Sequence, residues 1–331
     1  MILTPEGCRA RVARLRDALG TDWDAAVITL PEHILYLSNW LPDPNSLNFQ
    51  SYPCLLIERQ GGVTLFADNW HAAGVGQPPA SESAVVDRVE ASEWYGGVTP
   101  ARLRTRTVAE RVAETLRRLG VERLAAETAH VPFEIARAAR ETRDLEGTLR
   151  TLREVKDADE IAAIRLGIRA AEAVHAASRE LLRPGIREID YYAALVERAT
   201  ATIARPFVMM CDLASGPRAA QGGGGPTERV MQSGELVILD IFPYVGGYRG
   251  DITNTLVCGG SPSARDRELF AAVKEALEAA ERLLRPGTPA RVFSAAIEDR
   301  FRAFDPAARL VHHAGHAIGL GHPEAPELVP K

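Results

Sequence analysis

The chain has 331 residues, of which 46% are hydrophobic and 25% are charged, and its formal net charge is −5. This is the composition of an ordinary globular protein, and the length suits two domains better than one core. The acidic balance argues against a nucleic-acid-binding surface, so we expect no nucleic-acid partner. No stretch approaches the about 18 apolar residues that cross a bilayer, so we expect no membrane partner.

The cysteines and the amino-terminal segment bear on the cellular compartment. Cys8, Cys54, Cys211 and Cys258 show neither C-x-x-C spacing nor a regular framework. Unpaired thiols of this kind are typical of a reducing compartment. The first twenty residues have the apolar spacing of an amphipathic helix and lack the apolar core of a signal peptide. We therefore expect a cytoplasmic protein.

The first half of the chain alternates segments of helical and strand periodicity. In chain order the predicted elements are a helix over 5–19, a strand at Ala25–Thr29, a helix from Pro31 toward Asn39, strands near 53–58 and 62–67, an arginine-rich helix over 100–119, a strand near 122–126 and a helix opened by Pro132. Strands separated by helices indicate a mixed α/β layer. We place this α/β domain at residues 1–150.

A second composition begins at Leu152, and we assign residues 151–331 to a second domain. Asp157 and Glu160 form a D-x-x-E start signal for a long helix that runs to Leu182. A comparable start at Ser263 opens another long helix, which ends before Arg285-Pro286-Gly287.

The two long helices end in the same string. LLRPG occurs at 181–185 and again at 283–287, which is 102 positions later. One interpretation is chance, because Leu and Arg are abundant and helices often end in Pro-Gly. The other is an internal duplication, in which two helix–loop–helix units flank one sheet.

Two aspartates, Asp240 and Asp251, lie in the segment ELVILDIFPYVGGYRGDITNTLVCGG over residues 235–260. An apolar run of strand character precedes Asp240, and Gly246-Gly247 supplies the turn of a hairpin. We predict that Asp240 pairs directly with Asp251, so that both side chains project from one face. Two carboxylates on an apolar strand pair require a cation or a proton between them.

His316 lies in the glycine-containing segment VHHAGHAIGLGHPEAPEL, residues 311–328. Neutral imidazole is the commonest transition-metal ligand, and carboxylates complement it for Mn, Co or Zn. Two aspartates and one histidine at these separations indicate a metal site. The alternative that spacing leaves open is a pair of solvated or capping aspartates beside a turn.

The strings GGPTERVMQSGELVILDIFPYVGGYRGDITNTLVCGG and HHAGHAIGLGHPEAP resemble the pita-bread metallopeptidases, the family of Xaa-Pro aminopeptidase, prolidase and methionine aminopeptidase. The stretch WDAAVITLPEHILYLSNW is similar to the start of the creatinase-type N-terminal domain. The resemblance implies a creatinase-type α/β domain over 1–150 and a pita-bread domain with pseudo-twofold symmetry over 151–331.

The resemblance also implies roles for single residues. Asp240 matches a ligand of one metal, Asp251 the aspartate that bridges two metals, and His316 a ligand of the second metal. His312 matches a histidine that contacts substrate or moves a proton. A catalytic histidine of the family falls at Pro323, so its neighbour His322 is assigned that role.

The implied activity is hydrolysis of the bond preceding proline in short peptides. Two divalent ions, Mn, Co or Zn, share a water and polarise the scissile carbonyl in this chemistry. The family resemblance further implies a homodimer.

The family's ligand set ends with two glutamates in strands beyond the GH-IGL segment, and the printed sequence ends at Lys331. We expect both glutamates to be missing, the pita-bread domain to be incomplete, and metal binding and activity to be weak. One alternative is therefore an inactive homologue that serves as a binding or structural protein. Another is a metal-independent hydrolase of the creatinase type, which has no need of Asp240, Asp251 and His316 together.

Overall fold

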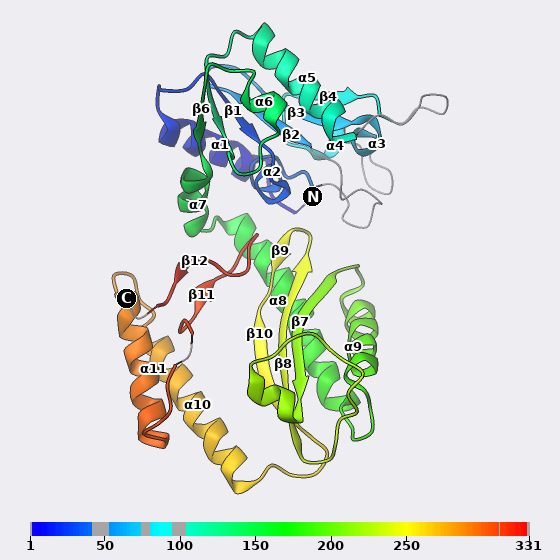
Figure 1. The fold of residues 1–331 in the computed structure, drawn as a ribbon, viewed down its shortest axis with the longest axis vertical. Coiled ribbons are helices and arrows are strands. Elements are labelled where there is room, and N and C mark those ends of the chain that lie inside the picture. The colour runs from blue at the N-terminus through cyan, green and yellow to red at the C-terminus, as the bar shows by residue number, and fades with distance from the viewer. Residues whose placement is uncertain (1, 42–52, 74–79, 95–103, 311, 330–331) are drawn as a thin grey trace. The chain divides into compact units, whose positions relative to one another are not determined.

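The computed structural model describes residues 2–41, 53–73, 80–94, 104–310 and 312–329. The chain divides into two compact units, Met1–Asp159 and Glu160–Lys331 (Figure 1). Each unit has its own sheet and its own buried cluster. Among the described helices, none combines the length and the apolar character needed to span a membrane.

The first unit contains a six-stranded sheet in the order β4-β3-β2-β1-β5-β6. Strands β1, β5 and β6 are mutually parallel, and β2 is antiparallel to both of its neighbours. The elements are α1 (Pro5–Leu19), β1 (Ala25–Ile28), α2 (Pro31–Ser38), β2 (Cys54–Glu58), β3 (Val63–Asp68), α3 (Asn69–Ala72), α4 (Ala80–Ser83), β4 (Arg88–Ser92), α5 (Arg104–Arg118), β5 (Arg123–Ala126), α6 (Phe133–Ala136), β6 (Glu141–Asp144) and α7 (Glu146–Glu154).

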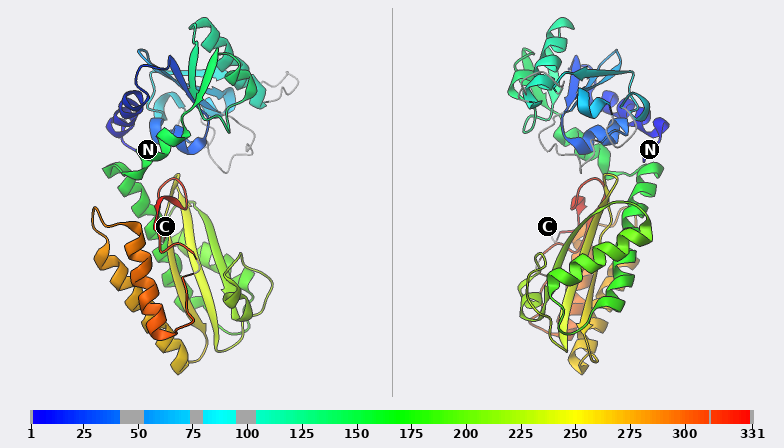
Figure 2. Two further views of the ribbon diagram at one scale, coloured as in Figure 1. Left: turned by 60° about the vertical axis from the view of Figure 1, so that its left-hand side comes forward. Right: turned by 90° about the vertical axis from the view of Figure 1, so that its right-hand side faces the viewer.

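Both faces of this sheet are covered, because every residue of β1 is buried. Helix α5 covers one face with Val108, Val112 and Leu116, which recur at helical spacing and join the buried cluster. Figure 2 shows α1 and α5 on opposite sides of the sheet. The predicted α/β layer is confirmed, although the start of the helix predicted over 100–119 lies outside the described residues.

The second unit holds a sheet in the order β10-β8-β7, with the short β9 paired to β8. Its elements are α8 (Ala158–Leu181), which begins at the unit boundary, α9 (Glu188–Ile203), β7 (Val208–Ser215), the 3-10 helix η1 (Gly216–Gln221), β8 (Glu235–Val245), β9 (Tyr248–Arg249), β10 (Ile252–Cys258), α10 (Ala264–Leu283), α11 (Ala290–Phe304), β11 (His316–Ala317) and β12 (Glu324–Glu327).

The two helix pairs of this unit follow the repeat found in the sequence. Helix α10 ends 102 residues after α8 ends, and α11 begins 102 residues after α9 begins. Ser263 and Asp266 form a reciprocal capping box at the start of α10. Helices α8 and α9 share a buried cluster with the sheet, whereas α10 and α11 share a separate one.

The predicted register of the aspartate hairpin is wrong by two residues. Asp240 pairs with Thr253, and Val245 pairs with Tyr248 across a two-residue Gly246-Gly247 turn. Pairing Asp240 with Asp251 would have paired Val245 with Gly246 and left no residues to form the turn. The two glycines have φ of 57° and 94°, as the turn requires. Since an even shift keeps every side chain on its face, Asp251 remains on the face of Asp240.

Candidate metal centre

Asp240 lies in the middle of β8 on the face turned away from the helices. Burial alternates along β8, and Leu239 and Ile241 on either side of Asp240 belong to the core shared with α8 and α9. Asp240 itself is half-buried, and its Oδ1 accepts a hydrogen bond of 2.6 Å from Thr253 Oγ1. Asp212 on β7 is its other cross-strand neighbour. Burial raises the pKa of Asp240, and repulsion from Asp251 and Asp212 adds to this rise.

Asp251 follows Gly250, and Gly250 is pressed against helix α8. A Cβ on Gly167 of α8 would lie 2.4 Å from Gly250 N, and a Cβ on Gly250 would lie 2.3 Å from the Gly167 carbonyl carbon. Gly250 N also donates a hydrogen bond of 3.1 Å to Pro243 O. The backbone that carries Asp251 is therefore held between a helix and a strand, and no side chain separates them.

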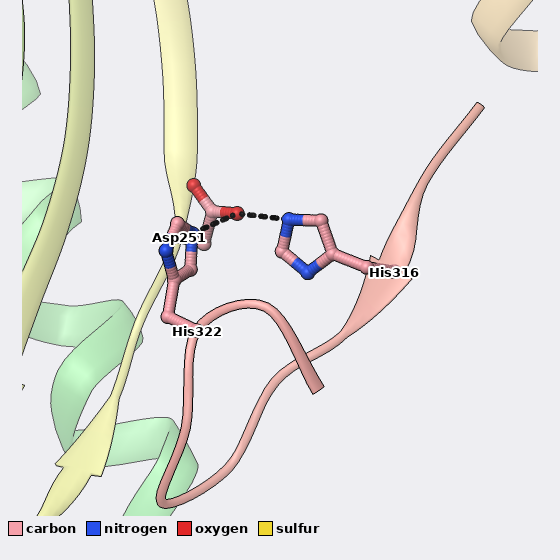
Figure 3. Close-up of side chains that lie close together, drawn as sticks. All are labelled: Asp251, His316 and His322. Carbon is pink, nitrogen blue, oxygen red and sulfur yellow. Dashed lines mark hydrogen bonds and ion pairs between the residues drawn. The ribbon is translucent and has the colours of Figure 1, made fainter. Parts of the chain in front are cut away.

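Two histidines of the carboxyl-terminal segment converge on Asp251 (Figure 3). His316 Nε2 lies 3.4 Å from Asp251 Oδ2, and His322 Nε2 lies 3.0 Å from the same oxygen. The His322 ring stacks on Phe242 with 4.6 Å between ring centroids. Arg249 N donates to Gly319 O at 2.9 Å, which ties this segment to β9.

The hydrogen bond that His316 makes through Nδ1 identifies Nε2 as the ring nitrogen that faces Asp251. Its Nδ1 lies 2.9 Å from Ala317 O. A carbonyl oxygen only accepts, so Nδ1 carries the proton. Nε2 is therefore the ring nitrogen that faces Asp251, and a hydrogen bond at Nδ1 is the contact that orients a metal-binding histidine.

His312 and the unpredicted His313 extend the cluster away from Asp251. His312 Nδ1 donates to His313 O at 2.8 Å, and the two rings are 5.0 Å apart. The His313 ring lies 5.0 Å from that of His316, nearly perpendicular to it. Burial lowers the pKa of His313, and the neighbouring His316 and His312 lower it further. The His-His pair in the sequence was the available signal for His313.

The residues present fit a divalent cation. One ligand atom each of Asp251, His316 and His322 can be chosen so that all lie within 4.8 Å of one another. Imidazole nitrogens with a carboxylate suit Mn, Co and Zn, and three protein ligands with an open position are typical of catalytic sites. Asp240 and His312 are not members of this group.

The two carboxylates that follow His322 have other surroundings in the described structure. Glu324 Oε1 accepts a hydrogen bond of 2.8 Å from Gly321 N. Glu327 is the cross-strand partner of His316 in the β11–β12 pair. Neither residue belongs to the Asp251 group.

Comparisons with known proteins place this chain in a family. Residues 162–331 match metallopeptidase family M24, and residues 11–161 match the creatinase/prolidase N-terminal domain. The probable dipeptidase PepE of Mycobacterium tuberculosis is 30% identical over 284 residues, which cover 85% of this chain and 72% of that protein. The Xaa-Pro dipeptidase of Lactobacillus helveticus is 26% identical over 322 residues, covering 92% and 80%.

Solved structures agree with the sequence matches. The Xaa-Pro dipeptidase from Bacillus anthracis gives a TM-score of 0.81 at 24% identity and covers 98% of this chain and 85% of that one. Dipeptidase PepE from Mycobacterium ulcerans gives 0.74 at 26% identity, covering 98% and 84%.

The chain belongs to metallopeptidase family M24, and its fold joins a creatinase-type N-terminal domain to a pita-bread domain. It is a peptidase by family. The family and the fold class predicted from the sequence are thereby confirmed.

Proposed function

We propose that this protein is a metal-dependent peptidase that hydrolyses the Xaa-Pro bond of short peptides. The observation that carries the proposal is the convergence of His316 and His322 on Asp251, on a sheet face that also presents Asp240. The relatives named Xaa-Pro dipeptidase support the choice of substrate.

In the proposed reaction, Asp240, Asp251 and His316 would hold two divalent cations, Mn, Co or Zn. Such cations would supply a water of lowered pKa and would polarise the scissile carbonyl. Asp251 Oδ2 faces both imidazoles, so Asp251 would serve as a ligand beside them.

The proposed roles of the other histidines concern the substrate. His312 donates through Nδ1 to a backbone carbonyl, which leaves its Nε2 to contact the peptide, or to take the proton released by the attacking water and pass it to the leaving proline nitrogen. His322, stacked on Phe242, forms the aromatic-lined side of the site.

The finer expectations from the sequence belong to the same proposal. We propose that the working metal is manganese and that the protein acts in the cytoplasm as a homodimer. Cys8, Cys211 and Cys258 are free thiols, which suits a reducing compartment. Mass measurement by light scattering on a size-exclusion column tests the dimer.

The test of the proposed function compares Ala-Pro with Ala-Ala hydrolysis by the full chain supplied with Mn²⁺, Co²⁺ or Zn²⁺. We expect cleavage of Ala-Pro only, abolished by a chelator and reduced at least about 100-fold in Asp251→Asn. His130→Gln is the matched control, because His130 is half-exposed and near Glu146 in the other unit. Cleavage that persists in Asp251→Asn or under chelation would contradict the proposal.

A further inference from the structure

His322 and His316 each direct Nε2 toward the same oxygen atom, Asp251 Oδ2. We infer that His322 is a metal ligand, and that Asp251, His316 and His322 together form a site for one divalent cation. The inference adds His322 to Asp251 and His316 at one of the two cations of the proposed function, and it leaves Asp240 to the other cation. The inference rests on the metal dependence in the proposed function and not on its substrate.

The separations of the three ligand atoms are those of groups that share one cation. Bonds of about 2.1 Å place neighbouring ligands about 3.0 Å apart in octahedral geometry and about 3.4 Å apart in tetrahedral geometry. Asp251 Oδ2 lies 3.0 Å from His322 Nε2 and 3.4 Å from His316 Nε2. Each of these pairs therefore has the separation of two ligands of one ion.

The contacts of His316 are compatible with this ligation. Its Nδ1 donates to Ala317 O, so Nε2 is the ring nitrogen that faces Asp251. A hydrogen bond from one ring nitrogen to a carbonyl is the contact that orients a metal-binding histidine.

The orientation of His322 is set by its surroundings before any ion binds. Its ring is parallel to that of Phe242, with an interplanar angle of 6°. Gly321 N, one residue earlier, donates to Glu324 Oε1 at 2.8 Å. Supporting contacts of this kind orient ligands and raise metal affinity.

Substitution of Asp240 distinguishes the two cations experimentally. Its Oδ1 accepts a hydrogen bond from Thr253, and it does not belong to the cluster around Asp251. If His322 is a ligand of the cation at Asp251 and His316, removing the Asp240 charge leaves that cation bound, and removing the His322 ring weakens its binding. If His322 is not a ligand, His322→Gln leaves the binding of that cation unchanged.

The test is titration of tag-free, metal-free full-length protein with Co²⁺, followed by calorimetry and by the visible absorption of the bound ion. We expect one tight Co²⁺ in the wild type and in Asp240→Asn. We expect His322→Gln to bind it at least about 10-fold more weakly, with a shifted absorption band because one imidazole is lost. His130→Gln controls for the loss of any histidine.

Circular dichroism of each metal-free variant shows whether it is folded. A Phe242→Leu variant provides a second approach, because it disturbs the orientation of His322 without removing a ligand, and we expect an intermediate affinity. Unchanged Co²⁺ affinity and spectrum in folded His322→Gln would overturn the inference, as would a loss in Asp240→Asn equal to that in His322→Gln. Normal Co²⁺ binding without Ala-Pro cleavage would instead count only against the proposed substrate.

Discussion

Glu188 is a fully buried carboxylate in the first turn of α9, and both of its oxygens accept hydrogen bonds. Its Oε1 accepts hydrogen bonds from Ser215 N and Oγ, its Oε2 from Thr227 N and Oγ1, and Arg218 completes an ion pair. Burial alone raises the pKa of Glu188, but the hydrogen bonds from Thr227 and Ser215 outweigh it. The pKa therefore lies below its ordinary value.

Replacing this carboxylate should weaken folding in a pH-dependent way. In Glu188→Gln an amide faces donors, so we expect the free energy of unfolding to fall by about 3 kcal/mol at pH 7. Because the folded pKa is depressed, the contribution of Glu188 is present above the unfolded pKa of about 4.3 and is lost as the pH falls through the folded pKa. Urea denaturation between pH 7 and pH 3 measures the difference.

The control for this substitution is Glu275→Gln on the exposed side of α10, where we expect a change within about 0.5 kcal/mol. A difference between Glu188→Gln and the wild type that stays constant down to pH 3 would refute the assignment.

Single residues also show the limit of reasoning from sequence. The segment around Asp240 and Asp251 identified the sheet face correctly, because side chains alternate along a strand. The contact of His322 with Asp251 joins residues far apart in the chain. Local spacing contains no signal for such a contact, so only the fold could place His322 beside Asp251.

At the scale of elements, the close approach of α8 to the segment before Asp251 is the feature most sensitive to substitution. Gly167→Ala adds a methyl group within 2.4 Å of Gly250 N, where neither backbone can move freely. We expect a loss of about 1–3 kcal/mol in the free energy of unfolding and weaker Co²⁺ binding through displacement of Asp251. Chemical denaturation and Co²⁺ titration check the two effects.

Helix α7 offers the matched glycine. Among the described residues, no atom lies within 4 Å of a Cβ on Gly147, so Gly147→Ala should stabilise the protein by up to about 1 kcal/mol. If Gly167→Ala behaved like Gly147→Ala, the contact with Gly250 would not exist in solution.

The helices and strands that were predicted correctly from the sequence are those with strong apolar patterns. Strand β1 and helices α1 and α10 follow their predicted ranges closely. Strand β6 has the sequence ETRD and is mostly exposed, so it carries no apolar alternation. It forms because β5 offers an edge for parallel pairing. The register of the β8–β10 hairpin was also not predicted correctly. Register depends on how many residues the turn occupies, and the apolar pattern does not specify that number.

At the scale of the whole molecule, all four tryptophans lie in the unit Met1–Asp159, and the cluster around Asp251 lies in the other unit. Tryptophan fluorescence therefore follows one unit, whereas circular dichroism follows both. Because a ligand stabilises only the structure that binds it, Co²⁺ at about 100 times its dissociation constant should raise the Tm of the second unit by about 5–10 °C.

The measurement is a thermal scan with both signals recorded on one sample. We expect the Co²⁺-dependent shift in the dichroism signal and no shift in the fluorescence transition. A fluorescence transition that moves by the same amount would mean that the two units unfold as one.

The repeat of helix pairs has a consequence for how the protein behaves on the bench. Leu269, Val273 and Leu277 of α10 are exposed, and they stand 102 positions after the α8 residues Gly167, Ala171 and His175, which are buried. Helix α10 thus exposes apolar side chains at the positions that correspond, 102 residues earlier, to buried residues of α8. Exposed apolar side chains attract hydrophobic dyes such as ANS to the folded protein. The fluorescence of such a dye is therefore a poor measure of how much of this protein is unfolded.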